Sequence, residues 1–129
     1  MPSPSPARTL VRRALLVSAG GAIGSAARLA LALIVPEPAG IPLPVLIANV
    51  CGALLLGILA ARLPASSEVR IFLGTGALGG FTTYSALAVG TAELWGQTPA
   101  LAAGYAAGSV LLGLAAVVAG LRLGRGRRT

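Results

Sequence analysis

The sequence predicts an all-α membrane protein in which four transmembrane helices form one domain. Of the 129 residues, 56% are hydrophobic and only 10% are charged, whereas soluble domains carry about 25% charged residues. Four apolar stretches recur along the chain, at about 15–35, 43–63, 71–95 and 100–123. Each has the roughly 20 residues that a helix needs to cross a hydrocarbon core of about 30 Å.

Turn-forming residues separate the four stretches. Prolines surround the first turn, a serine-containing segment after Pro64 forms the second, and residues 96–99 occupy the third. These turns are too short to hold a second domain, so we expect residues 1–129 to form a single four-helix membrane domain. Prolines and serines alternate near the N-terminus, and we therefore expect a flexible tail over residues 1–13.

All ten basic residues are arginines, and nine of them would lie on one side of the membrane. With four spans, the two tails and the middle loop share that side, and they carry Arg8, Arg12, Arg13, Arg62, Arg70, Arg122, Arg125, Arg127 and Arg128. The other two loops carry none. This bias predicts a multi-pass membrane protein with both termini in the cytoplasm. Because the arginines flank apolar spans and do not form a patch on a soluble fold, nucleic acid is not an expected partner.

The third stretch is unusual in its glycines and threonines, which are Gly74, Gly76, Gly79, Gly80, Thr82 and Thr83. Either these residues form an ordinary close-packing surface or they break the helix near its centre. In a broken helix the freed carbonyls must be buried in protein or used as ligands. A break there would lie near mid-membrane, as discontinuous helices do around ion sites.

Few polar side chains lie inside the spans, and those that do are hydrogen-bond donors. Arg28 shares a helix face with two glycines, which favours a buried guanidinium, and snorkelling to the nearer interface is the alternative. Asn49 is either an interhelical hydrogen bond or a donor to an anion. Tyr105 and Ser109 lie four residues apart, which suits either helix packing or a polar track along one face.

Several functional classes are excluded by what the spans lack. Glu37, Glu68 and Glu93 fall at or near span ends, so the bilayer core holds no carboxylate for proton-coupled antiport. His, Lys and Asp are absent from the sequence. There is accordingly no phosphate-binding motif with its lysine, no nucleophile–base pair and no metal-binding cluster. We expect no enzymatic activity, and the donor set suits a small anion.

Three motifs together resemble the Fluc (CrcB-type) fluoride channels. They are Gly20-Gly21-Ala22-Ile23-Gly24-Ser25-Ala26-Ala27-Arg28, Asn49-Val50-Cys51-Gly52 and Gly79-Gly80-Phe81-Thr82-Thr83-Tyr84-Ser85. The match covers nearly the whole chain and has the same four-span layout. The resemblance implies an antiparallel dimer that exports fluoride passively across the plasma membrane. It also implies a structural Na⁺ held by the backbone carbonyls of Gly79 and Thr82 from both subunits.

The resemblance assigns roles to further residues. Arg28 would lie near the vestibule, and the fluoride pathway would include Asn49, Tyr84, Ser85, Tyr105 and Ser109. The sequence also departs from the family pattern: Leu87 replaces a pore phenylalanine, Val45 a threonine, and Gly113 a serine of the polar track. These departures put at least one of the two symmetric pores of a homodimer in doubt.

Two other functional classes remain open. A small four-helix multidrug-type transporter would need a carboxylate in the first span, where this chain has Arg28. The chain could also be a non-conducting assembly subunit of a heterodimeric channel. Because the arginine bias makes the inverted orientation unfavourable, we expect a dimer with an oppositely oriented homologue, and an antiparallel homodimer is the alternative.

Overall fold

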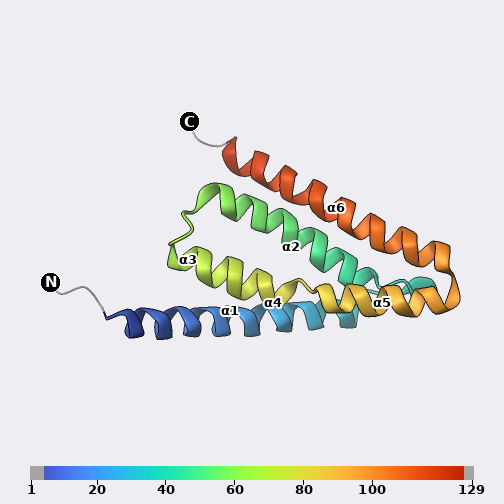
Figure 1. Cartoon of the computed structure of the whole chain (residues 1–129), viewed down its shortest axis with the longest axis horizontal. Coiled ribbons are helices and arrows are strands. Elements are labelled where there is room, and N and C mark those ends of the chain that lie inside the picture. The colour runs from blue at the N-terminus through green and yellow to red at the C-terminus, as the bar shows by residue number, and fades with distance from the viewer. Residues whose placement is uncertain (1–4, 127–129) are drawn as a thin grey trace.

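The computed structural model describes residues 5–126, and every regular element within that range is a helix. In chain order the elements are α1 (Pro6–Ile34), the short 3₁₀ turn η1 (Pro38–Gly40), α2 (Leu43–Arg62), α3 (Glu68–Arg70), the π-helix η2 (Ile71–Leu78), α4 (Gly79–Phe81), α5 (Tyr84–Gln97) and α6 (Pro99–Arg125). Figure 1 shows that α1, the α3–α4 segment, α2 and α6 lie next to one another in a fan. The α5 helix extends beyond α4 and meets the beginning of α6.

Three of the described helices, α1, α2 and α6, are long and apolar enough to cross a membrane. They contain 29, 20 and 27 residues, and at 1.5 Å per residue even α2 reaches about 30 Å. The chain is therefore an all-α, multi-pass membrane protein. The segment between α2 and α6 is divided into α3, η2, α4 and α5, each of which is shorter than a membrane-spanning helix.

The first helix begins earlier than the sequence led us to expect. We predicted a flexible tail over residues 1–13, but α1 is helical from Pro6 onward; residues 1–4 lie outside the described range. Proline is favoured in the first turn of a helix because its missing N–H needs no partner there. The alanine, arginine and leucine residues that follow are good helix formers, and they extend α1 well beyond its apolar stretch.

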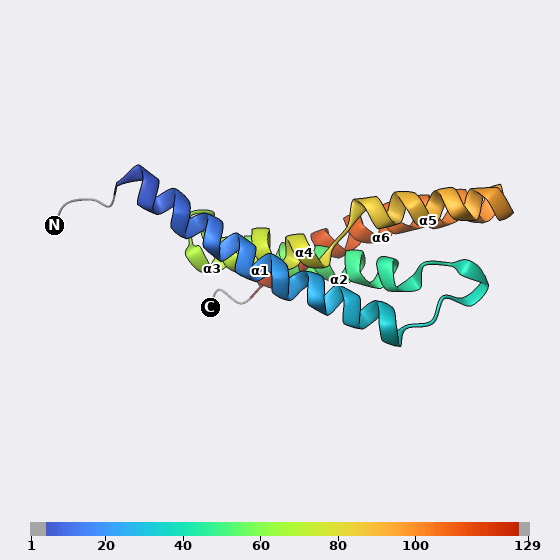
Figure 2. The same cartoon turned by 90° about the horizontal axis from the view of Figure 1, so that it is seen from below.

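Close backbone contact joins α1 to η2 and α4. A Cβ atom on Gly20 would lie 3.0 Å from the Cα atom of Gly76, and one on Gly24 would meet the carbonyl of Ala77. The same Cβ atom on Gly24 would lie 2.8 Å from the backbone nitrogen of Phe81, so the contact moves from Gly76 to Phe81 as it moves from Gly20 to Gly24. Contacts that advance together along both helices mean that α1 and η2 run parallel, as Figure 2 also shows. Small residues allow this approach, which in a membrane supplies much of the packing energy.

A second parallel pair is formed by α2 and α6. A Cβ atom on Gly57 would lie 3.1 Å from the Cα atom of Gly120, and one on Gly124 would lie 3.0 Å from the carbonyl oxygen of Ile58. At the opposite end of these helices, Leu94 of α5 is fully buried beside Tyr105. Many other large apolar side chains are exposed, so lipid or another protein chain must cover them.

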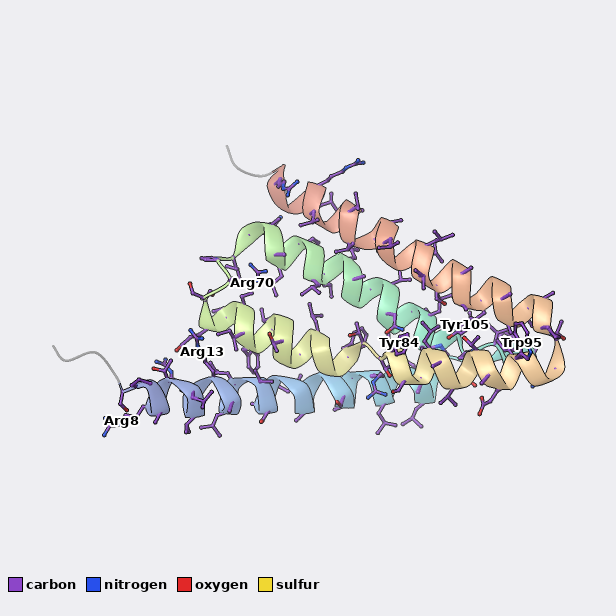
Figure 3. The ribbon with its side chains drawn as sticks, in the orientation of Figure 1. Arg8, Arg13, Arg70, Tyr84, Trp95 and Tyr105 are labelled. Carbon is purple, nitrogen blue, oxygen red and sulfur yellow. The ribbon has the colours of Figure 1, made fainter. Side chains whose placement is uncertain are left out.

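Charged residues gather at one end of the fan. Figure 3 shows Arg8, Arg13 and Arg70 toward that end and Trp95 at the other. The last turn of α6 brings two further arginines there, and we call this region the arginine end; Arg127 and Arg128 lie outside the described residues. Arg12 Nη2 lies 2.6 Å from Glu68 Oε2 and so ties α1 to α3.

Candidate functional site

The backbone is extended at two threonines between α4 and α5. Thr82 has φ −80° and ψ 156°, Thr83 has φ −153° and ψ 119°, and helical geometry resumes at Tyr84. Both threonine side chains support this conformation. Thr82 Oγ1 donates to the Leu78 carbonyl at 2.9 Å, which closes the end of α4, and Thr83 Oγ1 accepts from the Ala86 N–H at 3.2 Å, which caps α5.

Asn49 of α2 holds this extended segment through two hydrogen bonds. Its Nδ2 donates to the Thr83 carbonyl at 3.0 Å, and its Oδ1 accepts the Thr83 N–H at 2.7 Å. In a continuous helix that N–H would donate to the Gly79 carbonyl. The amide side chain has therefore taken the place of a helical acceptor. Of the two readings that the sequence left open for Asn49, the structure shows the interhelical bond, which uses one of the two Nδ2 donors.

Arg28 of α1 reaches the same region from the other side. Its Nε donates to the Gly80 carbonyl at 3.3 Å, and Ser25 Oγ donates to the same oxygen at 3.4 Å. Both groups satisfy a carbonyl near the C-terminal end of the η2–α4 segment, where a positive charge is favourable. Arg28 also lines a hollow of ≈ 390 Å³ together with Val45 and Ala86.

A hollow of ≈ 370 Å³ lies beside the extended segment. It brings together Asn49, Gly79, Thr82, Tyr84 and Leu87, all of which the sequence singled out. The Tyr84 side chain is 82% exposed and is available to a partner or an ion, and Figure 3 shows it at the middle of the molecule. Ser85 lies next to it, with its Oγ 3.1 Å from Thr83 Oγ1.

Tyr105 and Ser109 lie elsewhere. The Tyr105 hydroxyl donates to the Pro42 carbonyl at 3.2 Å, and Ser109 Oγ donates to the Tyr105 carbonyl at 2.6 Å. Both residues are buried, and the hollow beside the extended segment is lined by other residues. The Tyr105 bond joins α6 to the residue that precedes α2, whereas the Ser109 bond stays within α6.

Two contributors to the site were not identified from the sequence. Ser25 belongs to the first motif, but nothing in the sequence indicated that it shares an acceptor with Arg28. Thr83 was named in the glycine–threonine run and in the third motif, but no role was assigned to its backbone, which is the partner of Asn49. A serine three residues before an intramembrane arginine lies on the same helix face, and this spacing is the signal that could have identified Ser25.

The chain is similar to known proteins over most of its length. Residues 15–121 match the family model described as CrcB-like protein, Camphor Resistance (CrcB). A fluoride-specific ion channel FluC of Paracoccus denitrificans is 48% identical over 116 residues, covering 87% of this chain and 94% of the relative. A protein of the same name from Hyphomonas neptunium is 43% identical over 86% of this chain and 94% of its own length. The fluoride-specific ion channel FluC 1 of Mycobacterium tuberculosis is 47% identical over 82% of this chain and 85% of its own length. The chain therefore belongs to the CrcB-like family.

Proposed function

We propose that this chain is a subunit of a passive fluoride channel that lowers cytoplasmic fluoride by carrying the ion out across the plasma membrane. The observation that carries the proposal is the 48% identity, over 87% of the chain, to a protein named a fluoride-specific ion channel. The polar groups around the extended segment support it, because they are donors without a carboxylate among them. The multidrug-type transporter is disfavoured, since Arg28 stands in the first span where a carboxylate would be needed.

Fluoride would cross by exchanging its water shell for donors along the hollow beside the extended segment. The second Nδ2 proton of Asn49 is one such donor. The hydroxyl of Ser85, which lies next to Tyr84 but does not line the hollow, would be a further donor. The ring edge of Tyr84 carries positive quadrupole density and supplies a weaker attraction. Transport is passive in this proposal, because the spans contain neither a titratable carboxylate nor a nucleotide-binding motif to couple an energy source.

We further propose that the carbonyls of Gly79 and Thr82 bind a structural Na⁺. Carbonyl oxygens suit a hard cation, and the Gly79 carbonyl loses its usual helical donor because Thr83 N–H bonds to Asn49. Bound Na⁺ would place a fixed positive charge beside the anion path. The proposal is tested by assembling proteoliposomes in Na⁺ or in an impermeant organic cation. Fluoride efflux that is indifferent to this exchange would contradict it.

Two carbonyls per chain do not complete a coordination shell, so the proposal requires a second subunit in the opposite orientation. The α3–α5 segment would then form the third span of each subunit, and this span would be discontinuous. One sequence with arginines on a single side inserts poorly in the inverted orientation. We therefore propose that the partner is a homologue of opposite arginine bias, with both termini of the present chain in the cytoplasm. The replacement of pore residues by Leu87 and Val45 agrees with a partner that retains them.

The decisive experiment measures fluoride efflux from liposomes that contain this chain alone or together with a co-expressed homologue of opposite bias. The heterodimer predicts little efflux from the chain alone and full efflux from the pair. Full activity of the chain alone, with antiparallel self-pairs detected by cross-linking, would replace the heterodimer with a homodimer and leave the channel function intact. Absence of efflux in both preparations would contradict the channel proposal and favour a non-conducting assembly subunit.

A further inference from the structure

A second interhelical hollow, which we call the α2–η2 groove, has a volume of ≈ 440 Å³. Leu55 and Ile58 of α2 and Leu73 and Ala77 of η2 form its walls, and Arg62 of α2 lines it as well. Its volume lies in the range of small-molecule binding sites, which also favour clefts between the helices of a bundle. All of its lining side chains except that of Arg62 are aliphatic.

The groove opens on a different side of α2 from the hollow beside the extended segment. A helix turns by about 100° per residue, which puts Leu55, Ile58 and Arg62 roughly 120–180° around the helix from Asn49. Leu59, which also lines the groove, lies between these two sides and contacts η2 near Gly74. The proposed dimer uses the side with Asn49, so the α2–η2 groove remains open to lipid. Leu55 is 49% exposed and Leu73 is 38% exposed, as expected for surfaces that face hydrocarbon.

Arg62 supplies an uncompensated positive charge to this apolar groove. It is exposed, and within residues 5–126 neither a hydrogen bond nor an ion pair engages its side chain. The carboxylate at this end of the described chain, Glu68, already binds Arg12. The neighbouring Arg70 donates to the Leu63 carbonyl at 2.9 Å and so closes the end of α2. Arg62 is therefore the arginine of the groove that is free to bind an anion.

We propose that the α2–η2 groove binds one acyl chain of an anionic glycerophospholipid, with the lipid phosphate resting on Arg62. The aliphatic walls fit a hydrocarbon chain, and basic pockets between transmembrane helices on the cytoplasmic side are suited to anionic headgroups. Arginine binds phosphate through two parallel N–H donors. The assignment depends on the proposed channel dimer only in leaving this face to lipid, and it does not depend on fluoride transport.

The test is a lipid titration of the full-length protein, monitored by native mass spectrometry, with palmitoyl-oleoyl phosphatidylglycerol and the phosphatidylcholine with identical acyl chains. The first phosphatidylglycerol is expected to bind about fivefold more tightly, the factor contributed by one arginine at a membrane surface. Arg62→Gln should abolish this preference. Arg13→Gln, which removes the same charge from an exposed position of the arginine end outside the groove, should retain it.

A second pair of measurements distinguishes the contribution of the aliphatic groove to lipid binding from that of the Arg62 charge. Ala77→Leu fills part of the groove and should weaken binding of the first lipid of either class. Dihexanoyl phosphatidylglycerol has the same headgroup on shorter chains, so it should bind several-fold more weakly than the long-chain lipid. Equal binding of the two chain lengths would overturn the groove as the acyl-chain site.

Other outcomes would overturn the proposal as a whole. Equal affinity of the wild-type protein for the two long-chain lipids would do so, as would an identical loss of preference in the Arg13 and Arg62 variants. Disulfide cross-linking of two chains through Ile58→Cys, in a Cys51→Ser background, would identify the occupant as protein. Fluoride efflux is measured separately on the same proteins. Absence of efflux together with an intact lipid preference would contradict the proposed channel function and leave the lipid site standing.

Discussion

Replacing Asn49 with aspartate tests the site most directly, because the change alters one atom of the amide group. The new carboxylate would keep an acceptor for the Thr83 N–H but would lose the donor to the Thr83 carbonyl, now 3.0 Å away. Two oxygens would then face each other in a half-buried contact. An unsatisfied buried acceptor costs about 1–3 kcal/mol, so we expect the variant to fold but to unfold at lower temperature or denaturant concentration.

The same substitution has a larger effect on an anion that passes Asn49. Two unit charges 4 Å apart at an effective dielectric constant of about 20 repel each other by about 4 kcal/mol. A barrier raised by this amount lowers a rate about a thousandfold. Fluoride efflux from proteoliposomes should therefore fall to background in Asn49→Asp, far more than its loss of stability would explain.

Thr91→Val provides the matched control. It removes another half-buried side-chain bond, the 2.7 Å contact from Thr91 Oγ1 to the Leu87 carbonyl, without introducing a charge at the site. The Leu87 carbonyl keeps its helical donor, the Thr91 N–H, so this control should lose little stability and retain most of its flux. Wild-type flux in Asn49→Asp would remove this residue from the pathway, and unchanged stability would show that its contact with Thr83 contributes nothing to the fold.

Three further predictions concern topology, packing and the arginine of the first span. A reporter fused to the C-terminus should report the cytoplasm exclusively because of the arginine bias, and a substantial external population would contradict this. Gly24→Leu should prevent the contact with Ala77 and destabilise the protein severely, whereas Gly113→Leu has open space around it and should be tolerated. Thermal unfolding in detergent distinguishes the two variants, and equal unfolding midpoints would refute the packing argument. Arg28→Gln should lower the free energy of unfolding by about 1.5–3 kcal/mol, because the charged hydrogen bond to the Gly80 carbonyl is lost. Arg28→Lys should recover part of this stability in the same assay. A lysine variant no more stable than the glutamine variant would argue against a charge effect.

The fold class follows from the sequence because a bilayer leaves the backbone few choices. Long apolar stretches must satisfy their hydrogen bonds internally, so composition alone predicts helices. The beginning of α1 was harder to predict, because the signal for a disordered tail and the signal for a proline in the first helical turn overlap at Pro6. The helix propensity of the following residues favours the helix, and α1 begins at Pro6 in the structure.

The partners of polar residues could not be predicted in the same way. Spacing by four residues correctly puts Tyr105 and Ser109 on one helix face, but it does not say which neighbour that face meets. The partner of Tyr105 is a carbonyl 63 residues away in the chain, and that of Asn49 is 34 residues away. Such pairings depend on how the helices cross, which a single sequence does not encode in any local pattern.

The contact between Arg28 and Gly80 has a consequence for biosynthesis. These residues are separated by 52 positions, and at 5–20 residues per second a ribosome needs roughly 3–10 seconds to make that length. During this interval α1 resides in the bilayer with a guanidinium that has no protein partner, at a cost of about 2.5–3.5 kcal/mol on insertion scales. Docking of the newly made η2–α4 segment against α1 removes this cost. Assembly of the nascent chain therefore has a built-in driving force that acts only after the third stretch has entered the membrane.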